Sequence, residues 1–287
     1  MYGKKVRQEG WKVIGESVQG FSHLRSGKPC QDALSFCEVG EKKWLCALAD
    51  GHGSEKCKYS EEGARLAVEI TKDFWKELLA THSDLLLYEF LSQAKDIDLP
   101  KTLEKEWKKA VKFYHEGCQR EKAASDKELW MWYGTTLLFL LITDQLVFAM
   151  QLGDGDILSV FEGGETSWLL PNEQQYGTET YSLCQKNAWQ YFRSFLAPLS
   201  YYTMKPQLFI LSTDGYANSF ISHEDFLEVG KDYLNFLKKR ASKYLEAHLR
   251  EWLEETTRCG SGDDITVALV YSVQQGKGVG HPEKKDY

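Results

Sequence analysis

The sequence has little of what builds disulfide frameworks, zinc sites or membrane spans. Its seven cysteines are odd in number and scattered, with no Cys-x-x-Cys pair, so neither a disulfide framework nor a zinc site is predicted. No apolar run could span a bilayer, and Met1 to Gly10 is charged without the hydrophobic segment of a signal peptide. A net charge of -7 argues against non-specific binding to nucleic acid or acidic membranes. We therefore expect a cytoplasmic protein with no nucleic-acid or membrane partner.

The composition is that of a folded globular chain. Of its 287 residues, 43% are apolar and 27% are charged, which is enough apolar material for a substantial core. The sequence shows no linker and no internal repeat, so we expect one domain over residues 1–275 and a polar tail over 276–287. Residues 171–202 have little periodicity and many polar and aromatic side chains. They predict a long, flap-like excursion that could select a substrate or partner.

Hydrophobic periodicity predicts an alternation of strands and helices. Short strands are expected at residues 11–20, 33–39, 43–50, 134–142, 145–152, 157–161, 207–213 and 265–272. Helical spacing is expected from Ser60 to Leu79 and over residues 84–94, 103–123, 226–239 and 244–255. A Gly, His and Pro loop is expected between the first two strands, and a capping box at Ser222 to Asp225.

Four acidic residues stand where an apolar run meets a glycine-containing turn. Asp50, Asp154 and Asp214 each follow such a run, whereas Asp263 comes just before one. In antiparallel strands, the end of one strand lies beside the start of its neighbour. The four carboxylates are therefore expected to share one rim of a sheet.

Carboxylates that share a small space need a compensating positive charge, because each raises the pKa of the others. No Arg or Lys accompanies these four residues in the local sequence, so a metal is the natural counter-charge. Oxygen ligands without Cys or a clear His pair point to Mg²⁺ or Mn²⁺. Two such ions can activate a water and neutralise a phosphoryl group, so the expected reaction is phosphoester hydrolysis.

The ordered motifs resemble those of the metal-dependent serine/threonine protein phosphatases of type 2C, in their bacterial, single-domain form. The matching segments are Gln31-Asp32-Ala33, Asp50-Gly51-His52-Gly53, Gly134-Thr135-Thr136, Gly153-Asp154, Thr213-Asp214-Gly215 and Asp263-Asp264-Ile265-Thr266-Val267, which together run from about residue 15 to 272. The resemblance implies an α+β fold. In this fold, two mainly antiparallel sheets flanked by helices form an α-β-β-α sandwich, with a dinuclear metal site at one end.

The resemblance also implies a role for each matching residue. Asp50 corresponds to the carboxylate that bridges two Mn²⁺ or Mg²⁺ ions, and Gly51 would contribute its backbone carbonyl to one of them. Asp214 and Asp263 correspond to ligands of the other ion, and Asp32 would act through a bound water or else simply fix its loop.

Three further positions concern the chemistry and a weaker third ion. His52 corresponds to the general acid that protonates the departing oxygen. Asp154 is either a ligand of the third ion or a turn-forming residue, and Asn218 stands where the family often has a carboxylate for that ion.

The chain departs from the family at the cation that binds the substrate phosphate. Gly27 stands five residues before Asp32, where many members carry Arg. Arg25 is our first choice as a substitute, because a guanidinium can bind phosphate bidentately, and Lys28 or His23 are the alternatives.

The resemblance implies hydrolysis of phosphoserine and phosphothreonine in proteins by a metal-activated water. The substrate would be a phosphoprotein, made by an opposing serine/threonine kinase, and we expect a monomer. Two other functions stay open at this point. One is a weakly active or inactive phosphoprotein-binding scaffold with the same fold, for which the missing Arg is the only sequence support. The other is a hydrolase of small phosphoesters.

Overall fold

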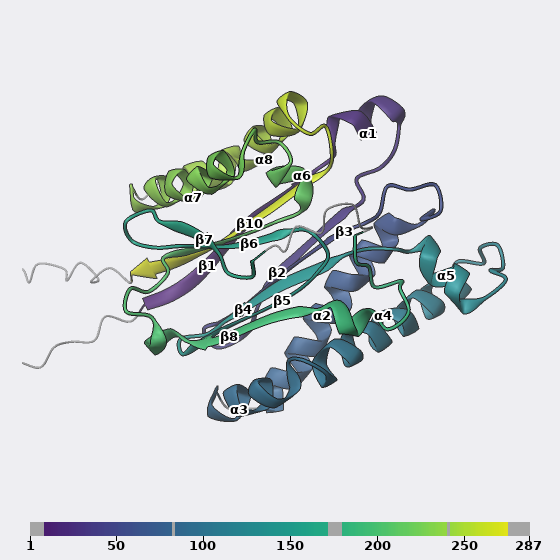
Figure 1. Ribbon diagram of the computed structural model, residues 1–287, viewed down its shortest axis with the longest axis horizontal. Coiled ribbons are helices and arrows are strands. Elements are labelled where there is room, and N and C mark those ends of the chain that lie inside the picture. Colours follow the sequence, from purple (N-terminus) through teal and green to yellow (C-terminus); the bar gives the residue numbers. More distant parts are fainter. Residues whose placement is uncertain (1–8, 82–83, 172–179, 240–241, 275–287) are drawn as a thin grey trace, which may run out of the picture.

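The computed structural model describes residues 9–81, 84–171, 180–239 and 242–274. Within this part of the chain, two five-stranded antiparallel sheets pack face to face, and helices cover both outer faces (Figure 1). The predicted α-β-β-α sandwich is therefore confirmed.

Each sheet combines strands from both halves of the chain. The first sheet has the order β1 (Glu9–Val18), β10 (Ile265–Gln274), β9 (Leu208–Ser212), β6 (Asp156–Val160) and β7 (Thr166–Trp168). The second has the order β2 (Asp32–Gly40), β3 (Lys43–Asp50), β4 (Leu137–Ile142), β5 (Leu146–Leu152) and β8 (Arg193–Pro198). Neighbouring strands are antiparallel in both sheets, so strand ends and strand starts meet at the same edge, as predicted.

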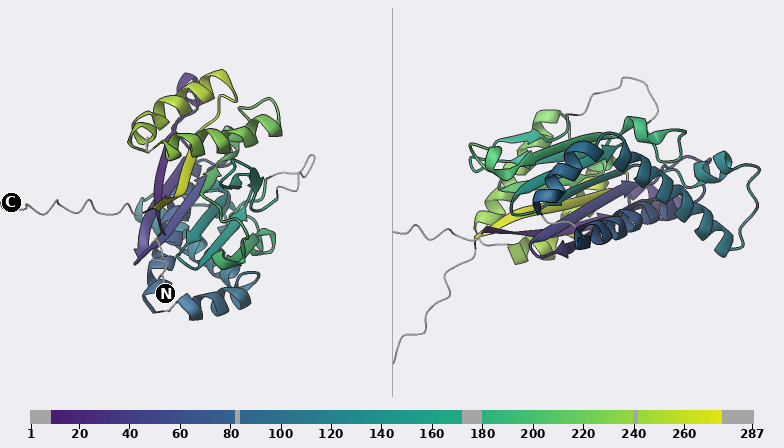
Figure 2. Two further views of the ribbon diagram at one scale, coloured as in Figure 1. Left: turned by 90° about the vertical axis from the view of Figure 1, so that its left-hand side faces the viewer. Right: turned by 90° about the horizontal axis from the view of Figure 1, so that it is seen from below.

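The outer layers are two groups of helices on opposite sides of the sandwich (Figures 1 and 2). The second sheet is covered by α2 (Ser60–Thr81) and α4 (Asp98–Gly117), with α3 (Asp84–Ala94) and α5 (Asp126–Trp132) nearby. The first sheet is covered by α7 (His223–Lys238) and α8 (Ser242–Cys259). The short elements are α1 (Phe21–Ser26), α6 (Asp214–Ala217), η1 (Ala188–Tyr191) and η2 (Leu199–Tyr201).

Apolar side chains form three buried layers, one between the sheets and one beneath each group of helices. Every residue of β4 and β5 is buried, because these central strands have a layer on both faces. Their sequences are accordingly continuous apolar runs rather than alternating ones. On the outer face, the fully buried Trp75 of α2 packs edge-on against Phe139 and Phe148, with ring centroids 5.7 Å apart in both pairs.

Two short helices differ from the sequence-based expectation. The predicted loop between β1 and β2 contains α1, whose six residues include none that is buried, so it carries no apolar periodicity. The second short helix, α5, lies between the helix predicted over 103–123 and the strand predicted from 134, where no element was expected. Its signal was a capping residue: the Ser125 side chain accepts a hydrogen bond from the Glu128 N–H. The capping box at Ser222 is confirmed by the same bond to the Asp225 N–H.

The predicted excursion at 171–202 also differs in its second half. Here β8 pairs with β5 along the edge of the second sheet. Only Ala197 among its six residues is buried, which explains why the strand was not recognised. Residues 172–179 and the expected tail at 276–287 lie outside the described residues. In the described chain, no helix combines the length and apolarity needed to cross a membrane.

Candidate metal centre

The predicted acidic rim forms at the end of the sandwich where α1 and α6 lie, on the right in Figure 1. Asp50 is the last residue of β3 and pairs with Asp32, the first residue of β2. Asp214 begins α6 directly after β9, and Asp154 follows β5. One carboxylate oxygen from each of Asp50, Asp154 and Asp214 lies within 4.8 Å of the other two. The structure therefore brings together three of the four predicted acidic residues as one cluster.

Asp50 is held by the two threonines that follow Gly134. Its N–H donates to the Thr136 hydroxyl (2.9 Å), and its carbonyl accepts from the Thr136 N–H (2.8 Å) and the Thr135 hydroxyl (2.9 Å). The Thr-Thr motif thus fixes the backbone that carries the carboxylate, which explains why these residue types stand there.

Gly51 is required by close packing. A Cβ at this position would lie 2.6 Å from the backbone oxygens of both Gln31 and Ser60. Any side chain would push β2 or the start of α2 away from the rim. The Gly51 N–H also donates to the Gln31 carbonyl (3.1 Å), which ties the turn after β3 to the residue before Asp32.

Asp32 connects the two sheets at the rim. Its Oδ2 accepts from the Thr213 hydroxyl (2.8 Å) and from the Thr266 hydroxyl (2.7 Å), and both threonines belong to the opposite sheet or its edge. Asp214 lies just beyond Thr213 and accepts from the Asn218 side-chain amide (3.0 Å). Asn218 therefore contacts one of the clustered aspartates directly.

The carboxylates of the rim raise one another's pKa. Burial, followed by neighbouring carboxylates, raises the pKa of Asp50 well above its ordinary value. Burial also raises the pKa of Asp32, against the hydrogen bonds from Thr266 and Thr213 that lower it. Burial and Asp154 raise the pKa of Asp214 to about 6. Among the described residues, the charged groups acting most strongly on these three are other carboxylates, which is the electrostatic setting that a divalent cation neutralises.

Asp263 lies beside the cluster, in the turn before β10. A Cβ on Gly215, the neighbour of Asp214, would lie 3.2 Å from the Asp263 Cβ, and Asp263 also raises the pKa of Asp214. Its side chain is 53% exposed, and its Oδ1 accepts from the Asp264 N–H (2.9 Å). Asp263 is thus placed next to the three clustered carboxylates, with its carboxylate open to solvent.

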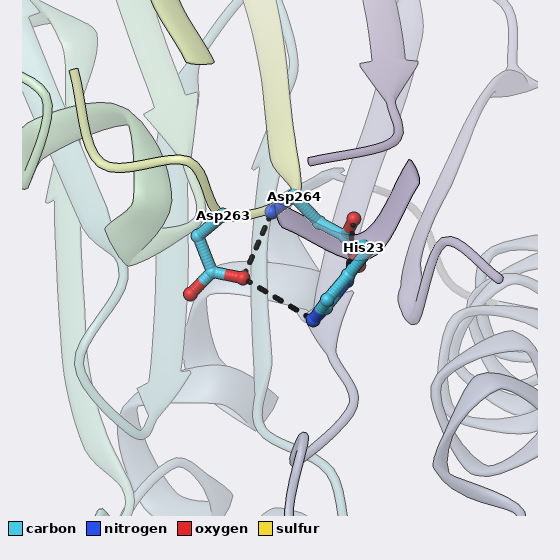
Figure 3. Close-up of side chains that lie close together, drawn as sticks. All are labelled: His23, Asp263 and Asp264. Atoms are coloured by element: carbon cyan, nitrogen blue, oxygen red, sulfur yellow. Dashed lines mark hydrogen bonds and ion pairs between the residues drawn. The ribbon is translucent and has the colours of Figure 1, made fainter. Parts of the chain in front are cut away.

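Asp263 also belongs to a second group, with His23 and Asp264 (Figure 3). His23 reaches in from α1, with Nε2 4.0 Å from Asp263 Oδ1 and Nδ1 3.0 Å from Asp264 Oδ1, the latter without hydrogen-bond alignment. The buried Asp264 accepts from the backbone N–H groups of Gly20 and Gln31, both at 2.6 Å. Sequence reasoning missed this arrangement, although the two consecutive aspartates were a visible signal.

The remaining predicted residues lie around this rim. His52 is two residues after Asp50, and its N–H donates to the Gly134 carbonyl (3.0 Å). The Thr180 hydroxyl donates to Asp154 Oδ2 (2.5 Å), which links the excursion to the cluster. Arg25 is exposed on α1. The Lys28 ammonium donates to the Gly53 carbonyl (3.3 Å), at the turn that carries His52.

Comparison with known proteins agrees with this arrangement. The sequence profile of the family described as Protein phosphatase 2C matches residues 19–254, whereas no curated protein matches the chain. Three examples illustrate the solved structures that share the fold. The catalytic domain of the serine/threonine protein phosphatase PstP, in complex with two manganese ions, is 16% identical with a TM-score of 0.58 over 93% of this chain and 100% of that one.

The second, the serine/threonine phosphatase Stp1 from Staphylococcus aureus, is 13% identical with a TM-score of 0.57 over 97% of this chain and 100% of that one. The third, a serine/threonine phosphatase from S. agalactiae, is 18% identical with a TM-score of 0.56 over 91% and 99%. At these identities the structures show a shared fold, and the profile match over most of the chain shows the family. The chain belongs to the protein phosphatase 2C family.

Proposed function

We propose that the acidic rim hydrolyses phosphoserine and phosphothreonine in proteins with two Mn²⁺ or Mg²⁺ ions. The observation that carries the proposal is the approach of three carboxylate oxygens within 4.8 Å, in a family of metal-dependent protein phosphatases. When bound, the ions would activate a water and neutralise charge on the phosphoryl oxygens.

The donor set fits hard divalent cations. Asp50, Asp154 and Asp214 offer only oxygen atoms, and mutual repulsion at the rim favours a bound positive charge. In the proposal, Asp50 and the Gly51 carbonyl would help to hold the ions. Asp214 and Asp263 would supply further oxygen ligands, which agrees with the position of Asp263 beside the cluster.

Two aspartates have supporting roles in the proposal. Asp32 would hold a water that is bound to an ion, and its two threonine donors fix its orientation for that task. Asp154 would bind a weaker third ion. The Thr180 hydroxyl already donates to one of its oxygens. Asn218, which stands where the family often has a carboxylate for that ion, donates to Asp214 instead, and the loss of that carboxylate also favours low affinity.

His52 supplies the proton in the proposed reaction. It lies two residues after Asp50 in the chain, and its backbone N–H donates to the Gly134 carbonyl (3.0 Å), which supports this role. In the proposal, it protonates the serine or threonine oxygen as the phosphoryl group departs.

A cation beside the rim is proposed to bind the substrate phosphate. Arg25 was the first choice from the sequence, and Arg25 and Lys28 are both exposed. The Lys28 ammonium, however, donates to the carbonyl of Gly53, one residue beyond His52. We therefore rank Lys28 ahead of Arg25. Lys28→Gln should raise the KM for a phosphopeptide by roughly tenfold, the effect of about 1.4 kcal/mol of lost binding. Arg25→Gln is the matched variant, and a larger KM change there would reverse the ranking.

The decisive experiment is hydrolysis of a phosphothreonine peptide with Mn²⁺ and with EDTA. Asp214→Asn should lower kcat/KM by at least about 100-fold. Removing a residue that only hydrogen-bonds to a metal ligand typically costs 10- to 100-fold in activity, and losing a ligand itself costs more. Glu251→Gln, on the exposed face of α8, is the matched control and should keep full activity.

Two other outcomes would redirect the proposal. Mn²⁺ binding without turnover of the peptide would support the scaffold function. Faster turnover of a small phosphoester than of the peptide would support a small-molecule hydrolase.

The cellular setting is part of the proposal. We propose a reducing, cytoplasmic location, a monomer, and substrates produced by an opposing serine/threonine kinase. All seven cysteines are unpaired in the structure, which is typical of proteins from reducing compartments. Cell fractionation tests the location, and size-exclusion chromatography with light scattering tests the monomer.

A further inference from the structure

Three chain segments meet side by side over Gly134, next to the proposed catalytic acid. On one side, the His52 N–H donates to the Gly134 carbonyl (3.0 Å). On the other, the Leu183 N–H donates to the Thr135 carbonyl (3.0 Å), which brings Cys184 alongside Gly134. The loop that leads into α2 closes over the same place and contributes Cys57.

The space above Gly134 is filled by two thiols and one imidazole. The position that a Cβ would take on Gly134 lies 2.9 Å from His52 Cδ2, 3.2 Å from Cys57 Sγ and 3.3 Å from Cys184 Sγ. The two sulfur atoms therefore lie no farther apart than the sum of the last two distances. Cys57 is buried and Cys184 is partly exposed.

Neither thiol has a part in the proposed hydrolysis. The metal ligands are oxygen atoms, and the general acid is an imidazole. A purely structural role would be met by any small apolar side chain, whereas two sulfur atoms facing one glycine also offer a specific covalent reaction.

We propose that Cys57 and Cys184 form a reversible disulfide that displaces His52 and switches the phosphatase off under oxidising conditions. Formation of the bond draws the two sulfurs to about 2 Å from each other, so at least one side chain must rotate across the space over Gly134. The His52 ring contacts that same space and must move with it. This inference rests on the proposed function only for its effect on activity.

The reaction needs one two-electron oxidant, for which hydrogen peroxide is the simplest. The Cys57 thiolate attacks one peroxide oxygen, the O–O bond breaks, and with a proton the released hydroxide leaves as water, so Cys57 becomes a sulfenic acid. The Cys184 sulfur then attacks the Cys57 sulfur, the S–OH bond breaks, and a second water leaves with the Cys184 proton. Two thiols are oxidised, and one peroxide is reduced to two waters.

The surroundings support this order of events. The Ser54 hydroxyl donates to Cys57 Sγ (3.5 Å), which orients that sulfur. Burial raises the pKa of the Cys184 thiol, so Cys184 suits the second, resolving step. A dithiol reductant reverses the reaction by thiol–disulfide exchange.

The test treats the full-length protein with hydrogen peroxide and maps its peptides without reduction. A Cys57–Cys184 linkage is expected. Activity on a phosphothreonine peptide should fall at least tenfold and return with dithiothreitol, since a displaced general acid forfeits part of its typical 10²- to 10⁴-fold contribution. Cys57→Ser and Cys184→Ser should each abolish the reversible fall. The exposed-thiol variant Cys118→Ser should respond like the wild type.

The single variants also test the order of the steps. Cys184→Ser should stop at a sulfenic acid on Cys57 that dimedone traps, whereas Cys57→Ser should give no such adduct. A dimedone adduct on Cys184 instead would overturn the order, and absence of the linkage in the oxidised wild type would overturn the switch.

A readout independent of activity separates this inference from the proposed function. The His52 imidazole resonances should shift on oxidation in the wild type but not in Cys57→Ser. If the reduced protein has no phosphatase activity, the proposed function fails, and the linkage and the His52 shift still decide the thiol switch. A linkage that leaves both His52 and activity unchanged would refute the switch.

Discussion

Replacing the buried Asp264 should show how much of its contribution to stability comes from its negative charge and how much from its hydrogen-bond acceptors. Each Asp264 oxygen accepts a backbone N–H at 2.6 Å, from Gly20 at Oδ1 and from Gln31 at Oδ2, and His23 Nδ1 lies 3.0 Å from Oδ1. The side chain is 4% exposed, so water cannot replace these bonds. The carboxylate thereby joins the start of α1, the start of β2 and the turn before β10.

The expected loss differs between two substitutions. In Asp264→Asn the amide keeps one acceptor oxygen, and its NH₂ group faces the second backbone donor. One charge-assisted bond is lost, and the free energy of unfolding should fall by about 1.5–3 kcal/mol. Asp264→Ala leaves both N–H groups unpaired and should cost roughly twice as much, about 3–6 kcal/mol.

The measurement is urea denaturation in EDTA, so that metal binding at neighbouring Asp263 does not contribute to stability. Glu251→Gln, on the exposed face of α8, is the control and should stay within about 0.5 kcal/mol of the wild type. Equal stability of Asp264→Asn and the wild type would show that the two N–H bonds do not depend on charge. An Asp264→Ala protein that loses less than about 1 kcal/mol would refute the role of this carboxylate altogether.

Three further perturbations test the packing and the metal site. Gly63→Ala should lower the free energy of unfolding in denaturant by at least about 3 kcal/mol, because its Cβ would lie 1.8 Å from the Tyr133 carbonyl oxygen. The control is Gly117→Ala, where nothing lies within 4 Å of the added Cβ and no destabilisation is expected. The raised pKa of Asp214, about 6, means that protons compete with metal, so the increase in Tm caused by Mn²⁺ should grow as pH rises through about 6, and an increase that is constant from pH 5 to 8 would contradict this. In EDTA, by contrast, the Asp214 contribution to the free energy of unfolding should fall as pH rises. A carboxyl group with a raised pKa stabilises the folded state below its unfolded pKa near 4, and this stabilisation is lost as pH rises to about 6.

The acidic rim could be predicted from the sequence because each of its signals lies within a short stretch of chain. Each apolar run that ends in Asp-Gly or Gly-Asp-Gly defines both a strand and the residue at its end. In an antiparallel sheet alternate strands end at the same edge, and β3 and β5 are such alternate strands. Asp50, Asp154 and Asp214 could be grouped in this way without knowing the register of any strand. Their clustering within 4.8 Å is confirmed.

Other features depend on contacts between distant segments and could not be predicted. His23 reaches Asp264 from a six-residue helix without a buried side chain, so its sequence carries no periodic signal. Cys57 and Cys184 are brought together by backbone pairing on either side of Gly134. They are 127 positions apart in the sequence, and α2, α3, α4 and α5 lie between them. β8 was missed because a half-exposed edge strand lacks the continuous apolar character of β4 and β5.

The position of the rim links catalysis to the packing of the two sheets. Asp32 belongs to the second sheet, but its Oδ2 accepts hydrogen bonds from Thr213, after β9, and Thr266, in β10, which belong to the first. A small sliding of one sheet over the other would break both bonds and separate Asp214 from Asp50. Because close-packed layers resist such sliding, the sandwich core keeps the carboxylates together against their mutual repulsion. The proposed ions would relieve that repulsion, so metal binding and sheet packing should stabilise each other.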